Sequence, residues 1–263
     1  MKRSWWINGA LLGAAAAVVV LEIVRPLRRR QREPKLRRME RNVVIGGLGA
    51  AAVQLCEQPI VLPLARYVER RRLGLLARAG LPSWVKTILA LAALDYTLYL
   101  WHTLVHRVPA LWRFHRVHHA DLDLDASTAI RFHFGELIAS VPWRAAQIVL
   151  IGVDARTLTL WQTLTLMSVI FHHSNVRLAP GVERAIGTVL VTPRMHGIHH
   201  SREEDEMDAN WSSGLSLWDW LHGTLRLDVP QDRIEIGVPE INSPALATLP
   251  RMLTAPFHHG TSR

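Results

Sequence analysis

Long apolar runs separated by short polar stretches dominate the pattern along the chain. Residues 5–24, 42–64 and 82–105 each approach or exceed the roughly 20 apolar residues that a helix needs to cross a membrane. Two shorter runs, 137–153 and 157–171, are joined by only a few residues, which predicts a helical hairpin dipping through most or all of the bilayer. The pattern therefore predicts an all-α, polytopic membrane protein with about four to five spans or hairpin helices. Five buried helices in a soluble chain of this length would leave too little polar surface.

The positive charge lies beside the apolar runs. The chain carries a formal net charge of +9, and residues 25–41 alone hold nine basic side chains. Basic residues next to a span mark the cytoplasmic side, so we expect this loop to be cytoplasmic. A second basic segment, 66–78, holds five arginines and could be an interfacial helix instead. This arrangement predicts a multi-pass integral membrane protein (in the cell membrane, if bacterial) and no nucleic-acid partner.

Histidine is concentrated in one part of the chain. Eleven of the fourteen histidines fall between residues 102 and 200. Most lie in four clusters: His102 and His106; His115, His118 and His119; His172 and His173; and His196, His199 and His200. Residues three and four apart share one face of a helix, so each spaced cluster can direct its imidazoles to one point. These are too many imidazoles for one four-coordinate metal, and about the right number for two metal ions.

The predicted topology places all four clusters on the cytoplasmic side, as a histidine-rich helical cap. Proline at 109 breaks the third span after His106, and Pro193 is typical of the first turn of a new helix. Imidazole suits zinc, copper, iron and nickel, and spacing alone does not choose among them. Carboxylates that could hold imidazole tautomers are Asp95, Asp121, Glu136 and Asp219. The single cysteine, Cys56, lies within a predicted span and excludes a thiolate site or a disulfide framework.

Five segments together resemble one family. HTLVH, LWRFHRVHH, HHSNVRL and HGIHH occur in order and are followed by DANWSSGLSLWDWLHGT; RFHFGE follows the second of them. Residues 90–230 resemble the fatty acid hydroxylase and sterol desaturase superfamily of membrane-embedded, histidine-box diiron oxygenases. The chain departs from the family pattern at Trp211, where tyrosine is more usual, and at His222, where phenylalanine is more usual. Neither position is an expected metal ligand.

The resemblance implies a ligand set. The nine expected metal ligands are His102, His106, His115, His118, His119, His173, His196, His199 and His200. Further candidates for direct ligation or for support of the ligands are His133, His172, Asp95, Asn210 and Asp219.

The resemblance also implies an activity, two iron ions as cofactor and O₂ as co-substrate. The expected reaction is hydroxylation or desaturation of an unactivated C–H bond in a lipid such as a fatty acyl chain, a sterol or an alkylglycerol. The chain has no dinucleotide-binding glycine motif, no iron–sulfur cysteine set and no segment like a fused cytochrome b5. A separate electron donor, a ferredoxin, a cytochrome b5-like protein or a flavoprotein reductase, is therefore implied. The expected division is 1–80 for anchor spans and basic loops, 81–230 for the catalytic domain and 231–263 for a tail.

Two alternatives keep the metal but not the oxygen chemistry. A zinc-dependent membrane hydrolase usually has three protein ligands and a general base, as in HExxH, which does not occur in this sequence. A metal transporter places its ligands near the middle of the spans, whereas the expected ligands here cluster at one end. Metal storage is the related possibility. Both alternatives leave the number or the placement of the histidines unexplained.

Overall fold

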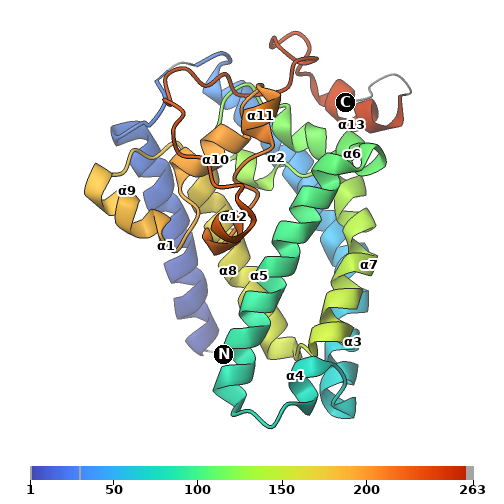
Figure 1. Ribbon diagram of the computed structural model, residues 1–263. Coiled ribbons are helices and arrows are strands. Elements are labelled where there is room, and N and C mark those ends of the chain that lie inside the picture. Colours follow the sequence, from blue (N-terminus) through green and yellow to red (C-terminus); the bar gives the residue numbers. More distant parts are fainter. Residues whose placement is uncertain (1, 30, 259–263) are drawn as a thin grey trace. The chain divides into compact units, whose positions relative to one another are not determined.

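The computed structural model describes residues 2–29 and 31–258, and these are almost entirely helical (Figure 1). Only isolated bridges between single residues represent β-structure in the described part. The elements in order are α1 (Lys2–Val24), α2 (Lys35–Ala52), the π-helix η1 (Val53–Glu57), α3 (Gln58–Arg71), α4 (Leu75–Arg78), α5 (Ser83–Arg107), α6 (Pro109–His119), η2 (Thr128–Ile130), α7 (Phe134–Ile151), α8 (Ala155–His173), α9 (Pro180–Gly187), α10 (Pro193–His199), α11 (Glu204–Met207), α12 (Leu217–His222), α13 (Leu249–Thr254) and η3 (Ala255–Phe257).

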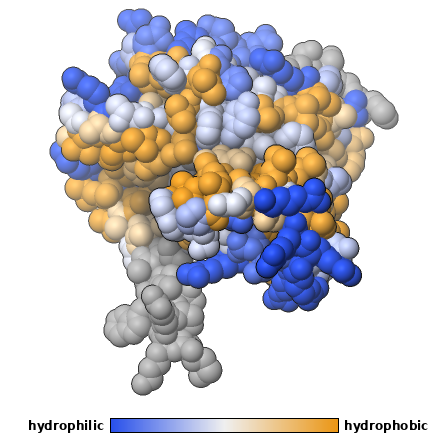
Figure 2. Space-filling view, turned by 60° about the horizontal axis from the view of Figure 1, so that its bottom comes forward, coloured by the Kyte–Doolittle hydropathy of each residue, from blue (hydrophilic) through white to orange (hydrophobic). Residues whose placement is uncertain are grey.

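The all-α membrane class is confirmed. Three helical stretches among the described residues are long and apolar enough to cross a membrane: Lys35–Arg78, Ser83–Arg107 and Phe134–Ile151. They correspond to the apolar runs at 42–64, 82–105 and 137–153. The run at 5–24 lies in α1, where Gly13–Val24 is a shorter apolar helix. The run at 157–171 lies in α8, which together with α7 forms the predicted pair of helices. Apolar side chains cover much of the face drawn in Figure 2, as expected for helices that contact lipid.

The chain divides into two compact units. One comprises residues 1–42, 119–130 and 166–248, and the other comprises 43–118, 131–165 and 249–263. We call them the first and the second unit. The division is discontinuous in sequence, because helices α6 and α8 each contribute residues to both. The expected boundaries near residues 80 and 230 stay predictions, and residues 259–263 of the expected tail lie outside the described residues.

The core of the second unit is a bundle of apolar helices. In it α7 packs against α3 and α5, and residues such as Val61, Leu94, Ile148 and Leu158 are fully buried. The bundle is closed at one end by two glycine turns. Gly74 and Gly152 have φ of +87° and +86°, and a Cβ on Gly74 would lie 2.3 Å from the Gly152 nitrogen. Glycine is required here both for the left-handed backbone and for the close approach. The bundle holds α5 in place, and the last two turns of this helix carry His102 and His106.

The first unit contains a buried charge network that fixes the segment following α6. Asp121 is fully buried. Its carboxylate accepts hydrogen bonds from Arg38 Nη1 (2.9 Å), Asn42 Nδ2 (2.8 Å) and Thr128 Oγ1 (2.7 Å). Arg38 also pairs with Asp125. Burial of so many polar groups is tolerated because each finds a partner. The network ties the start of α2 to the chain two residues after His119.

Candidate metal centre

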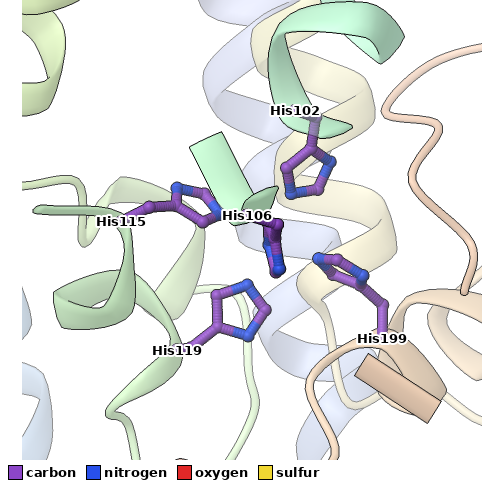
Figure 3. A group of neighbouring side chains, drawn as sticks. All are labelled: His102, His106, His115, His119 and His199. Carbon is purple, nitrogen blue, oxygen red and sulfur yellow. The ribbon is translucent and has the colours of Figure 1, made fainter. Parts of the chain in front are cut away.

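Three histidines of the second unit meet where α5 ends and α6 begins. His102 and His106 lie one turn apart near the end of α5, and His115 lies on α6. Their rings lie 5.1 Å (102–106), 5.1 Å (102–115) and 4.8 Å (106–115) apart between centroids. All three side chains are buried, and Figure 3 shows their rings facing one another. The helix break at Pro109 that the sequence predicts is what turns α6 back toward the end of α5.

Three histidines of the first unit meet through their Nε2 atoms. His173 ends α8, while His196 lies on α10 and His200 caps it. The Nε2 of His196 lies 3.0 Å from the Nε2 of His173 and 3.1 Å from the Nε2 of His200. Helix α10 begins as predicted: Pro193 occupies its first turn, and the side chain of Thr192 accepts a hydrogen bond from the nitrogen of Met195. Three nitrogens converging at such distances are typical of ligands around one ion.

Helix α6 carries three of the histidines. His115, His118 and His119 lie on this one continuous helix, so their relative positions are set by helical geometry. The ring of His118 lies 5.3 Å from that of His115. The ring of His119 lies 4.8 Å from that of His199 and stacks on His200 at 4.2 Å; Figure 3 shows His119 and His199 side by side. The three spaced histidines therefore lie on one face of α6, and His119 contacts two further histidines of the first unit.

The buried ring nitrogens that could hold metal ions form two groups, and within each group the candidate nitrogens lie within 4.8 Å of one another. The first group contains five histidines and the second contains four: His102, His106, His115, His119 and His199; and His118, His173, His196 and His200. These are the nine residues expected as ligands from the sequence. That they bind metal stays a prediction.

Hydrogen bonds to the Nδ1 atoms orient at least three of the rings. Nδ1 of His115 lies 2.9 Å from Glu136 Oε1, Nδ1 of His173 lies 2.8 Å from the Val169 carbonyl oxygen, and Nδ1 of His199 lies 2.9 Å from the Ala209 carbonyl oxygen. A carbonyl oxygen only accepts, so Nδ1 of His173 and His199 must donate. The Nε2 atoms then keep their lone pairs for a metal, which is the usual arrangement around metal-binding histidines.

Burial keeps His196 of the second group uncharged. The pKa of His196 lies well below its usual value, because the ring is completely buried and His172, His173, His200 and His199 surround it. A neutral imidazole is the form that binds a metal ion. The protonation state and the tautomers therefore both fit the donor set of a metal centre rich in imidazole.

Two of the additional histidine candidates have different environments. His172 is buried beside the second group, with its ring 4.0 Å from that of His196 and 4.7 Å from that of His173. His133 caps α7: its Nδ1 accepts from the Gly135 nitrogen, and its Nε2 donates to the Leu253 carbonyl oxygen at 3.2 Å. Burial lowers the pKa of His133, in agreement with a neutral ring whose two nitrogens both serve the backbone.

The polar candidates Asn210 and Asp219 hold a loop together. Asn210 has a φ of 53°, and its amide bonds the Met195 and Arg226 carbonyl oxygens. The Asp219 carboxylate accepts from the nitrogens of Trp211 (2.8 Å) and Ser212 (3.0 Å). This loop begins at Ala209, whose carbonyl oxygen orients His199. Asp95 lies half-buried on α5, about two turns before His102.

Glu136, one of the four carboxylates considered from the sequence, contacts His115 of the centre. Phe132, four residues earlier, stacks on His118 with ring centroids 4.3 Å apart and an angle of 10° between the planes. Trp112 packs on His106 at 4.9 Å. Neither aromatic residue was expected. Phe132 lies in the RFHFGE segment, so the sequence indicated the region and not the side chain. The carbonyl oxygens that orient His173 and His199 leave no trace in a sequence at all.

Replacement of Glu136 by glutamine is expected to lower turnover about 10- to 100-fold, the range typical of residues that orient metal-binding histidines. Glutamine keeps the size of the side chain but presents a weaker acceptor, and an alternative donor, to Nδ1 of His115. The measurement is turnover together with metal content of the purified protein. The exposed Glu204→Gln serves as the matched control. Unchanged turnover and metal content in Glu136→Gln would show that the His115–Glu136 hydrogen bond plays no positioning role.

Comparison with known families identifies the arrangement. The family model described as Fatty acid hydroxylase matches residues 87–224, a stretch that contains all nine histidines of the two groups. The chain belongs to the Fatty acid hydroxylase family. The histidines of both buried groups lie within the matched stretch.

Curated relatives of this family member are lipid-modifying oxygenases by name. The ornithine lipid hydroxylase of Rhizobium tropici is 28% identical over 157 residues, which are 60% of this chain and 46% of the relative. Human alkylglycerol monooxygenase is 26% identical over 53% of this chain and 30% of the relative. Mouse cholesterol 25-hydroxylase is 24% identical over 59% and 52%, respectively. The chain thus spans about half or less of the length of these relatives. No solved structure matches.

Proposed function

We propose that this protein is a membrane-bound, O₂-dependent diiron hydroxylase that oxidises an unactivated C–H bond of a lipid. The observation that carries the proposal is the pair of buried histidine groups. Within each group the candidate ring nitrogens lie within 4.8 Å of one another. Membership of the family and the hydroxylase and monooxygenase names of the relatives support it. Three relatives named for three different lipids do not select one substrate, so a membrane lipid is the proposed class. Desaturation begins with the same hydrogen removal and remains the alternative outcome.

The donor set fits two iron ions. We propose that one is held by the first group, His102, His106, His115, His119 and His199, and the other by the second group, His118, His173, His196 and His200. Activation of dioxygen and removal of hydrogen from a C–H bond is the chemistry that two irons supply when bound there. The chain's own contribution is orientation: Glu136 and the carbonyl oxygens of Val169 and Ala209 fix the tautomers of three ligands. Phe132 and Trp112 exclude water from the rings they cover.

We propose that a separate protein supplies the reducing equivalents. We propose a ferredoxin, a cytochrome b5-like protein or a flavoprotein reductase that reaches the histidine groups from the cytoplasm. The basic 25–41 segment, next to a span, supports a cytoplasmic location for this side of the protein. His102 and His106 lie in the last two turns of α5, a candidate membrane helix, so a lipid acyl chain beside α5 would need to move only a short way to reach them.

Metal analysis with O₂ consumption tests the proposal. Protein expressed in iron-rich medium and purified in detergent is expected to carry about two irons per chain, and to consume O₂ when given a chemical or enzymatic reductant and a mixed membrane-lipid extract. Products are identified by a mass increase of one oxygen atom, or by loss of two hydrogens for a desaturase. One zinc per chain with lipid hydrolysis would favour a hydrolase, and freely exchanging metal would favour transport. Two tightly held zincs without O₂ consumption after iron reconstitution would also overturn the oxygenase.

A further inference from the structure

The first unit contains a cavity that the metal chemistry does not use. It has a volume of about 480 Å³ and lies where α1 ends and the arginine-rich segment begins. Its polar lining includes Arg28, Arg32, Arg177 and Gln231, and its apolar lining includes Ile23, Leu124 and Ile234. The combination of an apolar wall with several guanidinium groups is unusual for a space that serves only packing.

Arg28 is held in place before any ligand arrives. Its backbone nitrogen donates to Asn175 Oδ1 and its carbonyl oxygen accepts from Asn175 Nδ2, both at 2.8 Å. Its Nη1 donates to Gln231 Oε1 at 2.6 Å. The guanidinium also abuts α10, because a Cβ on Gly197 would lie 2.2 Å from Arg28 Nη1. Gly197 is therefore needed to leave room for Arg28, and the arginine cannot easily turn away.

Two nitrogen atoms of this preorganised group have no acceptor. Nε and Nη2 of Arg28 are buried and make no hydrogen bond in the described structure, and the side chain as a whole is half-buried. Burial lowers the pKa of Arg28 to about 10, so the group is still charged at neutral pH. Leaving two N–H groups of a buried cation without acceptors is costly, and a planar pair of such donors matches the oxygens of a phosphate or carboxylate.

Nearby carboxylates are already engaged. Glu22 accepts from the nitrogens of Ala126 and Asn175, and Asp123 accepts from those of Arg32 and Glu33. Of the other lining carboxylates, Glu33 pairs with Arg41, Asp125 pairs with Arg38, and Glu235 pairs with Arg32 and Arg202. Asp232 is exposed. Glu22 and Asp123 lie near enough to Arg28 to favour its charge, but among the described residues neither Arg28 nor Arg177 forms an ion pair with a carboxylate. The two Arg28 nitrogens that have no acceptor, Nε and Nη2, therefore favour an anion as ligand.

The position of the cavity indicates where the anion comes from. Ile23 lines it and is 69% exposed, as is Val24 beside it. Both lie at the end of the apolar stretch of α1, directly before the basic 25–41 segment. Basic clusters directly beyond an apolar membrane segment attract anionic lipids. We propose that this cavity binds the phosphate of a phospholipid headgroup, with Arg28 as its principal donor. This site is separate from the metal centre and does not depend on the proposed reaction.

Binding of short-chain, soluble lipids to the delipidated full-length protein in a non-ionic detergent tests the proposal. Dihexanoyl phosphatidic acid is expected to bind at one saturable site per chain, and dihexanoyl phosphatidylcholine more weakly, because its headgroup cation offsets the phosphate. Arg28→Gln is expected to weaken phosphatidic acid binding at least tenfold, and Arg28→Lys less, since lysine keeps the charge but not the fork. Arg70→Gln, at an exposed arginine of the other basic segment, is expected to leave it unchanged.

Two results would overturn the proposal. Equal weakening by Arg28→Gln and Arg70→Gln would show non-specific attraction to basic surfaces. Inorganic phosphate binding as tightly as phosphatidic acid would show a site for the free anion and not for a lipid. Should Arg28→Gln fail to fold, the wild-type protein still decides: phosphatidic acid is expected to protect Arg28, but not Arg70, from phenylglyoxal, and equal modification with and without the lipid would reject the site. Metal content serves as an independent check that the histidine groups are intact.

Discussion

Replacement of His199 by alanine is expected to abolish turnover and to lower the iron content, while the protein still inserts into the membrane. His199 belongs to the group of five and is held by the Ala209 carbonyl oxygen. Its replacement removes a proposed ligand, so we expect the remaining imidazoles of the group to bind the ion more weakly. We expect turnover to fall at least about 100-fold, because replacing residues that only orient such ligands already lowers activity about 10- to 100-fold. The measurements are metal content and turnover of purified protein, with membrane yield as the control for folding.

The matched control is His222→Ala, since His222 is exposed at the end of α12 and lies outside both groups. It is expected to retain metal and turnover. His118→Ala gives a second test, because His118 belongs to the group of four. We expect it to behave as His199→Ala does, since both irons are needed for the proposed reaction. Full iron content and full turnover in the His199→Ala protein would refute the ligand assignment.

Replacement of Arg38 by methionine is expected to have the largest effect on stability. It leaves Asp121 and Asp125 buried without their principal cation, and breaking a buried pair from one side costs about 3–5 kcal/mol. Asp121 lies two residues after His119, so the loss also loosens the segment that follows α6. The expected result is a lower midpoint of thermal unfolding in detergent, followed by aggregation or loss of metal at temperatures that the wild-type protein tolerates.

The double variant Arg38→Met/Asp121→Leu tests whether the loss of stability comes from leaving a buried carboxylate unpaired. Removing both partners avoids part of the cost of an unpaired buried charge, so it is expected to be more stable than Arg38→Met alone. Replacing an exposed arginine, as in Arg37→Met, is expected to change the unfolding midpoint little. If Arg38→Met unfolds at the wild-type midpoint, the network does not stabilise the fold.

Several features of the fold could be predicted from the sequence because they depend on local spacing. The apolar runs marked the helices at 83–107 and 134–151, since helix length and hydrophobicity are properties of a continuous segment. Proline marked the starts of α6 and α10, and the i, i+3, i+4 spacing of histidines set which rings share a helix face. The motifs also indicate the family and nine candidate ligands.

The sequence alone determined the membrane class, the family and the list of histidines, because each is written in residues that are near one another along the chain. The tertiary structure decided how that list divides into groups of five and four, since His119 and His199 are 80 positions apart and meet only after folding. It also brought Glu136 against His115 and Asp121 against Arg38, contacts that the sequence did not specify. Contacts between distant residues, and carbonyl oxygens that every residue shares, carry no signal in a single sequence.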